Sequence, residues 1–109
     1  MKSWIPVLTI ERFLENLKSD GYRLWFRREA TCIYCTGLKE RISPEEFKVD
    51  MFHYFQDNNN PDGDRIIFSI TLTNGRKGFL IEMCNVYADN ISYEMEQRLR
   101  WTYPSPLFD

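Results

Sequence analysis

The chain has little net charge, few cysteines, a single histidine and no long apolar run, and each scarcity excludes a class of protein. Its 14 basic and 16 acidic residues give a formal net charge of -2, which offers no general attraction for a phosphate backbone. Nucleic acid is therefore a poor candidate partner. The three cysteines are an odd number and too sparse for a disulfide-stapled secreted domain, which predicts reduced thiols.

The only strongly apolar segment near the start of the chain, residues 4–8, is too short to span a membrane. Charged Glu11 and Arg12 follow it closely, which is unlike the flank of a signal peptide. We therefore expect no signal peptide, no membrane partner and a cytoplasmic location.

The composition is that of a single small globular domain, because 43% of the 109 residues are hydrophobic and 16% are aromatic. A chain of this length can build one stable core, whereas two cores would each be too small. The sequence has no internal repeat, low-complexity tract or linker. We predict one domain over residues 1–109, in which 102–109 form an extended tail because Pro104 and Pro106 cannot continue a helix.

The strongest local pattern lies at residues 65–84, where two apolar runs flank the pair Asn74-Gly75. Such a pair favours a type I′ turn, because both central residues of that turn need positive φ, so the stretch predicts a β-hairpin. We expect Thr73 to lie opposite Arg76. Strand side chains alternate between faces, so this register predicts a core face made of Ile66, Phe68, Ile70, Phe79, Ile81 and Met83.

Two segments have the apolar spacing of amphipathic helices. The first has apolar residues at 10, 13, 14 and 17, with Thr9 as its N-cap and Gly21 as its stop signal. The second has apolar residues at 91, 95 and 99, with Ser92 as its N-cap and an end near Trp101.

Extended runs at 22–28, 31–39 and 47–56 predict strands that precede the hairpin, with the polar loop 57–64 as the last connection. Ser43 and Pro44 predict a single helical turn before the third run. Strands separated by turns, and not by helical crossovers, predict an α+β fold. We expect an antiparallel sheet of about five strands with an N-terminal and a C-terminal helix packed on it.

Several short runs recur together in known proteins: 42–50 (Ile-Ser-Pro-Glu-Glu-Phe-Lys-Val-Asp), 60–62 (Asn-Pro-Asp), 77–78 (Lys-Gly) and 87–89 (Tyr-Ala-Asp). With them the chain resembles a family of small bacterial proteins of unknown function, often labelled phosphoribosylpyrophosphate synthetase. It departs from the family at Cys84 and Asn85, where members have Tyr-Gly. Enzymes with that name have two larger α/β domains and an acidic, glycine-rich pyrophosphate loop, for which this chain has no room. The resemblance implies a fold and not that activity.

Cys32 and Cys35 form a CxxC pair, which can donate two thiolates to a zinc ion. A closed zinc site needs four ligands, and the remaining candidates, His53 and Cys84, are predicted on opposite faces of the sheet. Redox chemistry favours a CxxC at a helix N-terminus, whereas this pair lies in an extended run. Two structural cysteines are the leading interpretation, and a zinc site at Cys32 and Cys35 is the alternative.

His53 stands among aromatic residues, which is more typical of a packed, hydrogen-bonded side chain than of a ligand or general base. The acidic residues include no pair that the sequence places across a cleft, so acid–base catalysis by two carboxylates has no support. Residues 58–64 have the oxygen spacing of a calcium loop, but the twelfth position is Ser69 and not Glu. We expect an ordinary polar connection there.

Basic and aromatic residues alternate at 22–28, and strand periodicity places Arg23, Trp25 and Arg27 on one face. Such a face could stack a base or hold a phosphate, and guanidinium packing on indole explains it equally well. We expect a non-enzymatic binding or regulatory domain that uses an exposed sheet face to contact a protein partner or a second copy. A zinc-binding domain using the CxxC and a small enzyme using His53 are the alternatives.

Overall fold

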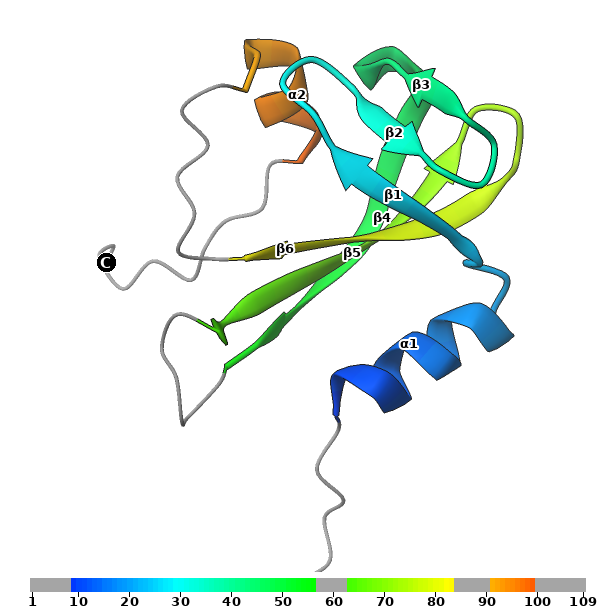
Figure 1. Ribbon diagram of the computed structural model, residues 1–109, viewed down its shortest axis with the longest axis vertical. Coiled ribbons are helices and arrows are strands. Elements are labelled where there is room, and N and C mark those ends of the chain that lie inside the picture. Colours follow the sequence, from blue (N-terminus) through cyan, green and yellow to red (C-terminus); the bar gives the residue numbers. More distant parts are fainter. Residues whose placement is uncertain (1–8, 57–62, 84–90, 100–109) are drawn as a thin grey trace, which may run out of the picture.

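The computed structural model describes residues 9–56, 63–83 and 91–99 of the chain. Figure 1 shows the two helices, the 3-10 turn and the six strands that they form. In chain order these elements are α1 (Ile10–Ser19), β1 (Leu24–Arg28), β2 (Ile33–Cys35), β3 (Glu40–Ile42), η1 (Pro44–Glu46), β4 (Phe47–Phe55), β5 (Arg65–Leu72), β6 (Lys77–Met83) and α2 (Tyr93–Arg98).

The strands form one sheet in the order β3-β2-β1-β6-β5-β4. Two antiparallel three-stranded halves, β1–β3 and β4–β6, meet at a parallel pair of β1 with β6. The α+β class is confirmed, but the expectation of a purely antiparallel sheet of about five strands was wrong. The sheet is mixed because β1 and β6 pair in parallel. It has six strands because the run predicted at 31–39 gives only β2 and a turn, and the residues after it form a further strand, β3, which pairs back on β2.

Gly78 allows the parallel pair to form, because β1 and β6 approach closely at Leu24 and Gly78. A Cβ atom added to Gly78 would lie 2.4 Å from the Leu24 carbonyl oxygen and 2.6 Å from Cε2 of Phe26. Contacts under 3.0 Å are essentially never made by real Cβ atoms, so a side chain at this position would separate the two halves of the sheet.

The predicted hairpin of β5 and β6 forms, but its turn contains three residues instead of two. The Leu72 N–H donates to the Arg76 carbonyl oxygen at 2.7 Å, and the Gly75 N–H donates back to the Leu72 carbonyl at 2.9 Å. Gly75 supplies the positive φ, at 92°, as in a type I turn followed by a left-handed residue. The type I′ prediction was therefore wrong.

The longer turn shifts the register by one residue, so Ile70 lies opposite Gly78 and not Phe79. Phe79 and Ile81 consequently lie on the face opposite to Ile70, because a register shift of one residue moves every side chain of the strand to the other face of the sheet. The sequence could not decide between the two registers because nearly all of β5 is buried on both faces. Either pairing hides the same apolar side chains.

The larger core lies on the side of the sheet where α2 is found (Figure 1). Both halves of the sheet and α2 contribute side chains to it. Ile42 of β3 lines a shallow hollow together with Leu72 and Thr73 at the end of β5. The predicted helix cap at Ser92 is confirmed, since its Oγ accepts from the Met95 N–H at 3.2 Å. Twelve buried residues make this core: Phe26, Ile33, Cys35, Ile42, Phe47, Ile66, Phe68, Ile70, Leu72, Leu80, Met95 and Leu99.

The smaller core lies on the outer face of β4–β6, which α1 covers. Buried Leu17 packs there with Ile67 and Phe79, and further side chains of α1 and of the sheet surround them. The outer face of β1–β3 continues this surface across the parallel pair of β1 with β6. The partly buried members of the smaller core are Ile10, Phe13, Leu14, Tyr22, Phe55 and Ile81.

Both predicted ends of α1 are confirmed. The Thr9 hydroxyl accepts from the Arg12 N–H at 3.1 Å, and Gly21 has a φ of 99°. The Tyr22 N–H donates to the Leu17 carbonyl at 2.9 Å, which completes a Schellman ending. The Tyr22 hydroxyl then donates to Asp50 at 2.8 Å, so the helix end is tied to the irregular part of β4 between Val49 and Met51.

The expected tail at 102–109, the end of the last helix near Trp101, and nearly all of the calcium-like loop lie outside the described residues, as does Cys84. Within the described residues, no helix is long and apolar enough to cross a membrane.

Candidate binding face on strands β1 to β3

The outer face of β1–β3 carries aromatic and basic side chains. Phe26, Ile33, Cys35 and Ile42 point into the larger core, so strand alternation directs the side chains between them outward. The register confirms this for Trp25, which lies opposite Phe79 of the outer face. We call the outward residues Arg23, Trp25, Arg27, Tyr34 and Arg41 the Trp25 face.

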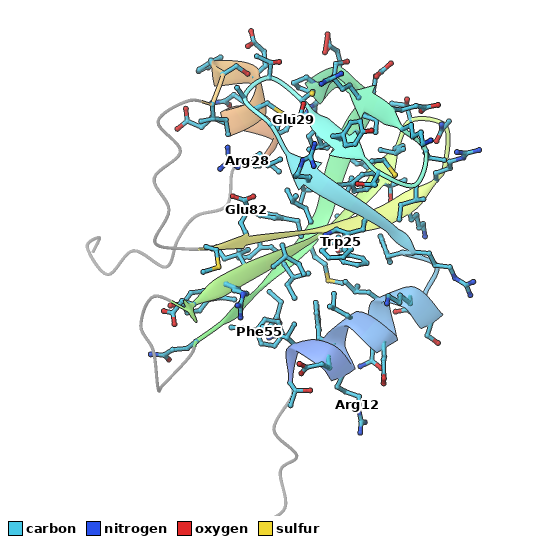
Figure 2. The ribbon with its side chains drawn as sticks, viewed as in Figure 1. Arg12, Trp25, Arg28, Glu29, Phe55 and Glu82 are labelled. Atoms are coloured by element: carbon cyan, nitrogen blue, oxygen red, sulfur yellow. The ribbon has the colours of Figure 1, made fainter. Side chains whose placement is uncertain are left out.

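The predicted shared face of Arg23, Trp25 and Arg27 agrees with this arrangement. Trp25 and Arg27 alternate with buried Phe26 in β1. The Nε of Arg23 donates to the Lys18 carbonyl oxygen at 3.3 Å, which places its side chain on the side of the sheet that α1 covers. Figure 2 shows Trp25 on the same side, next to α1.

Trp25 is the most exposed large apolar side chain of the sheet, with 63% of its surface accessible. One face of the indole stacks on Phe79, with ring centroids 6.0 Å apart and an interplanar angle of 23°. Phe79 itself is 4% exposed and belongs to the smaller core. The indole therefore has a rigid support on one side and open solvent on the other.

Glu29, in the turn after β1, gathers the polar groups of this face. Its carboxylate accepts from Nη2 of Arg27 at 3.1 Å, from Nε of Arg41 at 3.1 Å and from Sγ of Cys32 at 3.4 Å. The hydrogen bonds from Arg27 and Arg41 hold the pKa of Glu29 below its usual range, so the carboxylate stays charged.

The two guanidinium groups also pack on Tyr34. The Cζ atom of Arg27 lies 4.9 Å from the centre of the tyrosine ring, and that of Arg41 lies 5.7 Å from it. Both arginine side chains remain exposed, at 64% and 70%. Ion pairing and ring contact thus restrain two long side chains without removing them from water.

The thiols of the CxxC point to opposite sides of the sheet. Cys35 is fully buried in the larger core, whereas Cys32 donates to Glu29 on the outer side. Burial, followed by the hydrogen bond to Glu29, raises the pKa of Cys32, so its thiol is not activated as a nucleophile. Cys32 lies just before β2 with its sulfur at Glu29, whereas the sulfur of Cys35 lies in the larger core, so the structure does not bring the two thiols together as ligands of one ion.

His53 lies between α1 and the sheet. Its ring centroid is 4.9 Å from that of Phe13 and 4.5 Å from that of Phe55, and the two phenylalanines contact each other. These contacts are those of a packing residue. In the described ranges, no three His, Cys, Asp or Glu side chains are grouped as metal ligands.

Glu82 and Asp50, two further acidic residues of the sheet, make structural contacts. Glu82 pairs with Arg28 at 2.8 Å on the inner side of the sheet, toward α2 (Figure 2). Asp50 accepts from the hydroxyls of Tyr22 and Thr71. Each of these carboxylates has a hydrogen-bonded role within the fold.

The sequence did not identify Tyr34 and Arg41 as members of the Trp25 face. It also did not identify Glu29 as the carboxylate that pairs with the arginines of this face. Tyr34 lies inside the CxxC, between Ile33 and Cys35. Strand alternation with these two buried residues is the signal that would have placed its side chain on the outer face. Arg41 reaches Glu29 only because β3 pairs with β2, and β3 was not predicted as a separate strand.

Comparisons with known proteins find no match to this chain among protein-family models, curated proteins or solved structures. The resemblance to the small bacterial family therefore stays an expectation, and the chemistry of the Trp25 face is the basis for a functional proposal.

Proposed function

We propose that the protein is a small, non-enzymatic binding domain that holds a protein partner against the Trp25 face. The observation that supports this most is the 63% exposure of Trp25 on a rigid support. Full burial of a large apolar side chain contributes about 1.5–3 kcal/mol, and the exposed part of the indole leaves a share of such an energy for a partner to recover. Part of the apolar surface of the domain is thus available for association.

The composition of the face supports the same function. Tryptophan, tyrosine and arginine are the residues that contribute most often to the energetic centre of protein interfaces. Arg27, Tyr34 and Arg41 are already held by Glu29 and by ring packing, so binding orders fewer rotatable side chains. A restrained surface of this kind favours affinity without a large entropic cost.

The packing of His53 and the use of Glu82 and Asp50 in structural hydrogen bonds give catalysis less support than binding. Reduced thiols at Cys32 and Cys35 are in keeping with a cytoplasmic domain.

A selection of random peptides displayed on phage tests this function and requires no identified partner. Peptides should be enriched on the wild-type domain and lost when the bait is Trp25→Ala. The matched control is Tyr93→Ala, because Tyr93 is 69% exposed but belongs to α2. We expect the control to retain the selected peptides. Failure to enrich any peptide that depends on Trp25 would contradict the proposed function.

A further inference from the structure

We propose that the partner presents an extended acidic segment to the Trp25 face, with an apolar side chain on Trp25 and a carboxylate on Arg27 and Arg41. This inference rests on the proposed function and specifies the chemistry of the partner at the same face.

The charge of the face favours an anionic ligand. Two guanidinium groups, those of Arg27 and Arg41, share the single carboxylate of Glu29, which leaves one net positive charge among these three groups. Arg23, near the other end of β1, adds a further guanidinium group to the same face. The whole chain has a net charge of -2, so this excess is local and not a property of the entire surface.

The two arginines at Glu29 have unused donors. Arg27 reaches Glu29 with Nη2 and Arg41 with Nε, although a guanidinium group carries five N–H donors. Both side chains are mostly exposed, so the remaining N–H groups are accessible. A second carboxylate can therefore bind these groups while Glu29 stays bound, through the paired geometry that arginine favours.

The spacing along β1 fits an extended peptide. Trp25 and Arg27 are two residues apart on one strand, which separates their side chains by roughly 6.6–6.8 Å. Alternate residues of an extended peptide have the same spacing. A segment that lies along β1 can thus place an apolar residue on the indole and an acidic residue two positions away over the guanidinium groups.

The same face is less suited to a nucleic acid. Single-stranded nucleic acids bind where successive bases stack on open aromatic rings along a basic groove. Trp25 offers an open ring, but the ring of Tyr34 already contacts Arg27 and Arg41. Binding of an oligonucleotide in preference to an acidic peptide is accordingly an outcome that would overturn the proposal.

The test uses fluorescence polarisation with three labelled probes and the full chain. The first probe is a short peptide in which every second residue is serine and the positions between are leucine and glutamate in turn. The second probe has lysine in place of glutamate. The third probe is oligothymidylate of similar length. We expect the acidic peptide to bind most tightly and its affinity to fall as salt is raised.

Variants of the two arginines separate recognition from a purely structural role. Arg27→Ala and Arg41→Ala should each weaken binding of the acidic peptide by about 10- to 100-fold, because each removes charge-assisted hydrogen bonds to the carboxylate of the peptide. Arg41→Lys keeps the charge but not the planar fork, so it should restore only part of the affinity. Circular dichroism confirms that each variant is folded before titration.

The outcomes also separate this inference from the proposed function. Peptides could bind in a Trp25-dependent way but with the same affinity whether they contain glutamate or lysine. The proposal of an acidic partner segment would then be wrong, and the proposed binding function of the Trp25 face would stand. If the arginine variants bind as well as the wild type, the contact with Arg27 and Arg41 is wrong. If display yields no Trp25-dependent peptide, the proposed function itself fails.

Discussion

Replacing Gly78 with alanine should separate the two halves of the sheet. Gly78 lies opposite Leu24 in the parallel pair that joins β1 to β6. The new Cβ would lie 2.4 Å from the Leu24 carbonyl oxygen, 2.7 Å from the Leu24 Cβ and 2.6 Å from Cε2 of Phe26. The strands must therefore spread, and the packing of Phe26 in the larger core must loosen with them.

The expected cost follows from these contacts. Overpacking of a well-filled site destabilises by about 1–3 kcal/mol. Loss of one or two hydrogen bonds in the parallel ladder, including the one from the Arg23 N–H to the Lys77 carbonyl at 3.2 Å, adds about 1 kcal/mol each. The free energy of unfolding should fall by about 2–5 kcal/mol, a large part of the roughly 5–15 kcal/mol that small domains possess.

Urea unfolding followed by far-ultraviolet circular dichroism measures this loss. Gly37→Ala is the matched control, because a Cβ there meets nothing within 4 Å. The control should change the free energy of unfolding by less than about 0.5 kcal/mol. If Gly78→Ala is as stable as Gly37→Ala, the inference that β1 and β6 approach too closely for a side chain at position 78 is wrong.

Three further measurements test other parts of the structure. Glu29→Gln should destabilise the protein at neutral pH and lose this effect in acid. The pKa of Glu29 is lower in the folded state than its ordinary value of 4.5. The stability that Glu29 contributes is therefore present above pH 4.5 and disappears as the pH falls through its pKa in the folded state. Chemical denaturation across this range measures the difference, and a gap independent of pH would contradict it. His53→Phe should alter the free energy of unfolding by less than about 1.5 kcal/mol in urea titrations, since it preserves the ring contacts with Phe13 and Phe55, whereas loss of folding would reveal a polar role. Elemental analysis of protein purified without a metal-binding tag should find no near-stoichiometric zinc, because Cys32 and Cys35 face opposite sides, and one zinc per chain would refute that placement.

Local signals in the sequence predicted the local elements well. Thr9, Gly21 and Ser92 mark helix ends in the sequence and do so in the structure, because capping depends on residues within one turn. The strand predicted at 47–56 is β4 almost to the residue. In these cases the determining contacts are close in sequence.

The arrangement of the sheet depends on distant contacts and could not be predicted in the same way. The parallel pairing joins Leu24 to Gly78, which no local turn signal can indicate. The hairpin register was wrong by one residue because β5 is buried on both faces, so alternation gave no preference.

The candidate site was predictable only in part. Alternation placed Trp25 and Arg27 on one face, which agrees with the structure. Glu29, Tyr34 and Arg41 join them through the β1–β2 turn and the pairing of β3, so their shared network is a tertiary feature.

The most direct measurement is the affinity of a peptide selected on the wild-type domain for Trp25→Ala and Tyr93→Ala side by side. Trp25→Ala should weaken binding by about 30-fold or more, as expected for a central interface residue that contributes at least about 2 kcal/mol. Tyr93→Ala, which removes a similarly exposed ring from α2, should bind as the wild type does. Equal affinity of the two variants would contradict a binding role for the Trp25 face.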